Sequence, residues 1–108
     1  MLTKDSKTVL YHLYKEYLAR KKNNAPKIDA KSFGSASMIR DSMFPDWILE
    51  DVEESLRELG RNGFLNNLYA DDTVCECLLT DSAIITLENQ KKNIFLSVAD
   101  FISKFTPL

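Results

Sequence analysis

The chain has 108 residues, of which 44% are hydrophobic and 28% are charged, and its net charge is −2. This length allows one domain with a modest core, and the composition excludes a largely disordered chain. No stretch approaches the roughly 18 consecutive apolar residues of a membrane-spanning helix, and the first residues lack an apolar signal core. We therefore expect a single cytoplasmic domain over residues 1–108 that does not contact a membrane.

The charges are distributed unevenly along the chain. Residues 1–40 hold nine Lys or Arg against three Asp or Glu, whereas residues 41–108 hold five against thirteen. The two halves therefore have opposite electrostatic character, which the net charge conceals.

The first predicted helix covers residues 6–22 and is amphipathic. Its apolar residues recur at helical spacing and form one wide buried face: Val9, Leu10, Leu13, Tyr14, Tyr17 and Leu18. Asn23, Asn24 and Pro26 predict its end. The residues PKID are expected to be extended and to include a short edge strand, because Pro26 lacks an amide hydrogen and restricts the residue before it.

Two further helices are predicted over residues 35–43 and 46–61. The second of them starts at Pro45 or Asp46, since proline is tolerated in a first turn and aspartate can cap the free amide groups there. The apolar residues of the shorter helix are Met38, Ile39 and Met43. The buried stripe of the longer helix is formed by Ile48, Val52, Leu56 and Leu59.

A β-hairpin is predicted over residues 64–79, after a left-handed helix exit at Gly60 or Gly63. Its strands are the runs FLNNLYA and VCECLLT, which have strand composition. Asp71, Asp72 and Thr73 between them are suitable turn residues.

The C-terminal region over residues 81–105 is predicted to be helical, with Thr80 or Asp81 as its cap. One long helix and two helices that meet near Asn89 are both open, because no glycine or proline enforces a break. Its wide apolar stripe consists of Ile94, Phe95, Val98, Phe101, Ile102 and Phe105. This stripe could pack on the first helix or form a homodimer about a two-fold axis.

Cys75 and Cys77 are the two cysteines of the chain, and both side chains are expected on the same face of a strand. A zinc site needs about four ligands, so we interpret them as a buried, reduced pair. His12 is expected to be an exposed helix residue. The sequence shows no glycine-rich phosphate loop, no metal-ligand set and no recognisable nucleophile with a base. We therefore expect neither an enzyme nor a cofactor.

The predicted order of helix, short strand, helix, helix, hairpin and helix resembles the winged helix-turn-helix superfamily. The segments ILEDVEESLRELGRNGFL and CLLTDSAIITL carry this resemblance, because a third helix runs through glycine into a first wing strand and the second wing strand ends at the next helix. The layout resembles MarR-type and PadR-type regulators and, in size, small phage-associated YjcQ-like proteins. It implies a mainly α fold with a small hairpin (α+β), and a nucleic-acid-associated, transcription regulator-like protein of phage or mobile-element type.

In this superfamily the third helix enters the major groove of double-stranded DNA, and the wing contacts the neighbouring backbone. The groove-facing residues would be Asp46, Trp47, Glu50, Glu53, Glu54, Arg57 and Arg61. Carboxylates on this face repel phosphates. Arg57 could contact guanine, but Glu53 and Glu54 are placed to pair with it, which leaves Arg61 as the freer arginine. Asp71 and Asp72 occupy the wing turn, where DNA recognition favours a cation.

The candidate nucleic-acid contacts are Arg20, Lys21, Lys22, Lys27, Lys31, Arg40, Arg57 and Arg61. Cations near the end of the first helix also suit its negative pole, so both a structural role and contacts to phosphate are open. If DNA is bound, we expect this flank to contribute more affinity than the third helix.

The acidic third helix also supports an alternative function, a winged-helix protein interaction module that does not bind DNA. The candidate surface for a basic protein partner consists of Trp47, Glu50, Glu53 and Glu54. A plain solvated face is the other interpretation of the carboxylates. Trp47 could close the core at the turn between the helices or anchor a partner.

Overall fold

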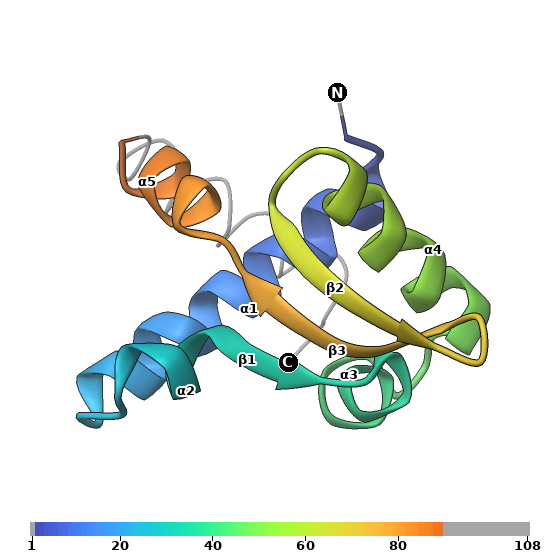
Figure 1. Ribbon diagram of the computed structural model, residues 1–108, viewed down its shortest axis with the longest axis horizontal. Helices are drawn as coiled ribbons and strands as arrows, with labels where there is room; N and C mark the ends of the chain where they lie inside the picture. Colours follow the sequence, from blue (N-terminus) through green and yellow to red (C-terminus); the bar gives the residue numbers. More distant parts are fainter. Residues whose placement is uncertain (1, 90–108) are drawn as a thin grey trace.

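A computed structural model describes residues 2–89 as an α+β fold of five helices and one antiparallel sheet of three strands. The elements are α1 (Lys4–Lys22), α2 (Lys27–Lys31), β1 (Ser32–Gly34), α3 (Ala36–Met43), α4 (Leu49–Arg61), β2 (Leu65–Ala70), β3 (Thr73–Leu79) and α5 (Asp81–Asn89). The strand order is β1-β3-β2, so β3 lies in the centre (Figure 1). The predicted α+β class is confirmed. The predicted dimer stripe lies outside the described residues, and so does the chain after Asn89 on which the choice between one helix and two depends.

The core lies between α1, α4 and one face of the sheet. Its fully buried members include Val9 and Leu13 of α1, Leu56 and Leu59 of α4, and Leu79 of β3. The helical spacing predicted for α1 and the end of α4 therefore identified residues that pack together.

Helix α1 begins two residues earlier than predicted. The side-chain oxygen of Thr3 accepts a hydrogen bond from the amide of Ser6 at 3.2 Å, which makes Thr3 the cap of the helix. The helix ends at Lys22 with Asn23 as its C-cap, and Asn24 adopts a left-handed φ of 65°, so the predicted end is confirmed.

The prediction of an extended PKID segment is wrong. Residues 27–31 form the short helix α2, and the edge strand follows at Ser32–Gly34. Pro26 stands directly before the helix, where its missing amide hydrogen costs nothing, and its carbonyl accepts a hydrogen bond from Ala30 at 2.9 Å. Proline therefore starts a helix here.

The predicted start of the third helix is also wrong. Helix α4 begins at Leu49, because the preceding residues form a turn in which the amide of Trp47 bonds the carbonyl of Phe44 at 3.0 Å. The two rings pack with their centroids 4.8 Å apart, and Trp47 lies half-buried against the core. Ile48, predicted in the buried stripe, is instead 64% exposed.

The predicted hairpin is confirmed as β2 and β3. Asp71 and Asp72 have φ values of 53° and 62°, the combination that a tight two-residue turn requires and that aspartate tolerates. Gly63 provides the left-handed exit from α4 with a φ of 81°, whereas Gly60 lies within the helix.

The prediction that Cys75 and Cys77 share one buried face is wrong. Leu68 pairs with Glu76 and Tyr69 pairs with Val74, so β3 carries an extra residue, a β-bulge. The bulge reverses the alternation of side chains, and Cys75 is exposed while Cys77 is buried. Both thiols are free, and burial raises the pKa of Cys77 to about 12, which keeps this thiol protonated at neutral pH.

His12 is half-buried, so its predicted exposure is wrong. Its ring lies edge-on to Phe44 with centroids 4.8 Å apart, and Nδ1 lies 2.9 Å from the carbonyl oxygen of Thr8. Burial lowers the pKa of His12 from its ordinary value. The turn after α3 covers this side of α1, which the spacing of residues in α1 alone does not indicate.

Candidate functional site

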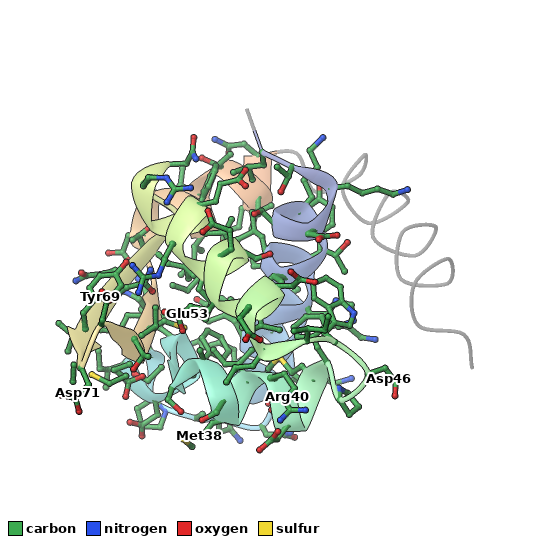
Figure 2. All side chains as sticks on the ribbon, turned by 90° about the vertical axis from the view of Figure 1, so that its right-hand side faces the viewer. Met38, Arg40, Asp46, Glu53, Tyr69 and Asp71 are labelled. Carbon is green, nitrogen blue, oxygen red and sulfur yellow. The ribbon has the colours of Figure 1, made fainter. Side chains whose placement is uncertain are left out.

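The face of α4 beside the hairpin is held together by Glu53. Figure 2 shows Glu53 on α4, with Tyr69 and Asp71 on the hairpin. One oxygen of Glu53 accepts hydrogen bonds from the amide of Val74 at 2.9 Å and from Nε of Arg57 at 3.1 Å. Glu53 therefore belongs to the internal framework rather than to a solvated acidic face.

Arg57 is bound on three sides by the protein itself. Arg57 pairs with Glu53, as described above. Its Nη2 also donates to the carbonyl oxygen of Asp72 at 2.6 Å, and its guanidinium lies 5.0 Å from the ring centroid of Tyr69. The predicted pair with Glu53 is confirmed. This arginine fixes the hairpin to α4, and contact with a guanine would require these interactions to break.

Glu54 pairs with Arg61 at 3.1 Å rather than with Arg57. The two residues are seven positions apart, which places them two helical turns apart on the same side of α4. The expected pairing of Glu54 with Arg57 is therefore wrong, but Arg61 has one exposed partner where Arg57 has three contacts, so the expectation that Arg61 is the freer arginine is confirmed. Both side chains are exposed, and such pairs contribute little stability, so Arg61 can exchange its partner at low cost.

Glu58 joins α4 to the start of α1. Its oxygens accept hydrogen bonds from the amide of Thr3 at 2.7 Å and from the hydroxyl of Thr3 at 2.9 Å. The amide hydrogen bond is the main cause that lowers the pKa of Glu58. This acid, like Glu53, serves the fold.

The outward acids gather where α4 begins. Asp46, Glu50 and Asp51 are exposed there, and between them Ile48 is 64% and Leu49 is 38% exposed. We call these five residues the α4-start surface. It combines exposed apolar residues with exposed acids that flank them in the sequence. The helical spacing does not indicate this combination, because it predicts Ile48 in the core.

Arg20 is occupied by contacts inside the molecule. Its Nε pairs with Glu16 at 2.9 Å, its Nη1 donates to the carbonyl oxygen of Ser32 at 2.7 Å, and its guanidinium lies over Phe33. It joins the end of α1 to β1 and is therefore a structural residue.

Most other predicted nucleic-acid contacts also have partners. Lys27 and Lys31 pair with Asp81 at 3.4 Å and 2.8 Å, which joins α2 to α5 and lowers the pKa of Asp81, chiefly through the Lys31 hydrogen bond. Nε of Arg40 lies 3.0 Å from Oδ1 of Asp41, which makes an ion pair. The geometry is not that of a hydrogen bond, and the buried Nε has no hydrogen-bond partner. Within residues 2–89, Lys21 and Lys22 at the end of α1 are exposed and form no ion pair.

The described part of the chain contains no group of three or more His, Cys, Asp or Glu side chains that could hold a metal ion. None of its helices is long and apolar enough to cross a membrane. No protein-family model, no curated protein and no solved structure matches the chain. The geometry of the α4 face, the hairpin and the basic end of α1 is therefore the basis for a functional proposal.

We predict that Glu53→Ala destabilises the protein by about 2 kcal/mol, because the buried amide of Val74 loses its acceptor and Arg57 loses its charge partner. Urea denaturation measures the loss, and amide hydrogen exchange at Val74 should accelerate. The matched control is Glu54→Ala, one position along the helix, which removes an exposed pair and should cost less than about 0.5 kcal/mol. Equal losses in the two variants would contradict the role assigned to Glu53.

The lowered pKa of Glu58 predicts a pH dependence of stability. A carboxylate with a lower pKa in the folded state contributes stability above its unfolded pKa and loses it as the pH falls through the folded pKa. Urea midpoints measured from neutral pH to about pH 3 should therefore decline less steeply in Glu58→Gln than in the wild type. Glu88→Gln, which alters an exposed acid of α5, should retain the wild-type slope. A wild-type slope in Glu58→Gln would contradict the prediction.

Proposed function

We propose that this protein is a winged-helix domain whose function is to bind another protein. The order of α1, β1, α3, α4 and the hairpin β2–β3 supports this fold, with α3 and α4 as the helix-turn-helix pair and the hairpin as the wing. The sheet order β1-β3-β2 supports it too, because the first strand borders the hairpin. Helix α2 is an addition to that layout.

The observation that carries the proposal is the α4-start surface. Ile48 and Leu49 are exposed at the point where a helix begins, and the exposed acids Asp46, Glu50 and Asp51 flank them in the sequence. Exposed apolar residues surrounded by charged ones are typical of a protein-binding surface. The acids favour a basic partner and repel a nucleic-acid backbone.

The contacts of the arginines on α4 support a protein partner as well. Arg57 is engaged by Glu53, by the carbonyl of Asp72 and by the ring of Tyr69. The hairpin turn presents exposed Asp71 and Asp72 where a DNA-binding wing would present cations. Both elements that a winged helix uses against DNA therefore lack available positive charge, apart from exposed Arg61.

A nucleic-acid-associated, transcription regulator-like function of phage or mobile-element type is the second candidate. The observation that favours it is the pair Lys21 and Lys22, which are exposed and form no ion pair within residues 2–89. Such residues at the end of α1 could contact phosphates from the flank of the domain. In this case α4 would contribute less affinity than α1.

Titration with random duplex DNA distinguishes the two functions. We expect no binding even at low salt, because the exposed acids at the start of α4 and at the wing turn repel phosphates. Binding at low salt that weakens steeply at moderate salt would overturn the first proposal. In that case Lys21→Glu combined with Lys22→Glu should reduce both the affinity and its salt dependence. Lys7→Glu combined with Lys15→Glu, two exposed positions of the same helix, is the matched control.

The protein-binding proposal predicts a preference for basic amphipathic segments. A synthetic helical peptide of Leu and Lys should shift the amide resonances of Ile48, Leu49 and Glu50, and the same peptide with Glu in place of Lys should not. Ile48→Ser combined with Leu49→Ser should weaken binding at least tenfold. Ile28→Ser combined with Ile85→Ser is the control, since these residues are 61% and 56% exposed elsewhere. Equal binding of both peptides would contradict the proposal.

A further inference from the structure

We propose that the outer edge of β2 binds a second copy of this chain, strand to strand and antiparallel, about a two-fold axis. This inference goes beyond the proposed function, because it concerns a different surface and a different partner. Figure 2 shows Asp46 of the α4-start surface on one side of the molecule and Tyr69 and Asp71 of the hairpin on the opposite side. The two surfaces could therefore be occupied together.

The outer edge of β2 is an unprotected sheet edge. Within residues 2–89, β2 pairs with β3 on one side only, so alternate N–H and C=O groups along its other side point outward. Proteins usually protect such an edge with a charged residue or a proline. The strand reads LNNLYA and contains neither, and its Leu68 and Tyr69 are 53% and 51% exposed. This is an edge suited to pairing.

The direction of α4 along β2 determines which charges stand at each end of this edge. The amide of Phe64, just before β2, donates to the carbonyl of Leu59 near the end of α4. Glu53, near the start of α4, accepts from the amide of Val74, which pairs with Tyr69 near the end of β2, so α4 runs antiparallel to β2. Arg61, at the end of α4, therefore lies near the start of the strand. Asp71 and Asp72 stand at the other end of the strand, and all three side chains are exposed.

This arrangement of charges identifies the partner as a second copy. Antiparallel pairing of β2 with β2 brings Arg61 of each chain to the Asp71 and Asp72 end of the other, and the two-fold axis makes this contact twice. Parallel pairing would place the two aspartate turns side by side, where they repel. The self-complementary charges therefore select one orientation of one partner. Arg61 must leave Glu54 for this contact, and that exposed pair is weak.

The first test measures the mass of the full chain by light scattering over a range of concentrations. We expect the mass to rise from 12.4 kDa toward twice this value as the concentration increases. Leu68→Lys introduces the charge that usually protects an edge strand and should weaken dimerisation at least tenfold. Ile85→Lys is the matched control, because Ile85 is 56% exposed on α5, and this variant should dimerise like the wild type.

The second test addresses the charges and does not depend on Leu68→Lys. Arg61→Glu places a carboxylate opposite the partner's aspartates, so it should weaken dimerisation at low salt and less so at high salt. Asp71→Asn should weaken it too, because asparagine retains the left-handed backbone and removes one charge. Circular dichroism establishes that each variant is folded.

Two results would overturn the proposal. One is a wild-type chain that remains monomeric at several hundred micromolar. A monomer would also be the result if residues 90–108 of the same chain covered the edge, and that result would equally overturn the proposal. The other is a dimer that survives both Leu68→Lys and Arg61→Glu, because it must then use another surface, such as the apolar stripe from Ile94 to Phe105. Neither result bears on peptide binding at the α4-start surface, so the two proposals fail independently.

Discussion

The carboxylate of Glu53 is the constraint on which the arrangement of the described fold depends most. It binds the amide of Val74 in the hairpin and the guanidinium of Arg57 in its own helix, and Arg57 in turn binds the carbonyl of Asp72. A hairpin of two strands is marginally stable by itself. The hydrogen bonds from α4 fix its orientation, and they also determine which charges remain available to an external partner.

The acidic character of α4 has several separate causes that a count of charges does not distinguish. Glu53 and Glu58 accept hydrogen bonds from backbone amides of distant segments, Val74 and Thr3. Glu50 lies at the positive end of the helix, where acids are favoured, and it is exposed. Apart from the exposed Glu54, which pairs with Arg61, the acidity of α4 that can act on a partner therefore lies in the first turn and its approach.

The sequence predicted those features whose causes lie within a few residues. The spacing of Leu10, Leu13 and Tyr17 predicted the buried face of α1, and Asp71 with Asp72 predicted the turn. Features fixed by tertiary packing were missed. The packing of Trp47 on Phe44 delays the start of α4 and exposes Ile48, and the β-bulge separates the environments of Cys75 and Cys77. For the same reason, the sequence indicated an acidic partner surface near Glu50 but not its exposed apolar residues.

The fixed position of Arg57 disfavours DNA as a partner and favours a second β-strand at the edge of β2. Its guanidinium lies against Tyr69 and is bound by the carbonyl of Asp72, so its charge is largely compensated beside the edge strand. A compensated cation adds little attraction for phosphate, which weakens the case for DNA at this face. The same compensation leaves β2 bordered by one exposed cation at one end and by acids at the other. Exposed charges of opposite sign at the two ends of a neutral strand set the direction in which another strand can pair with it.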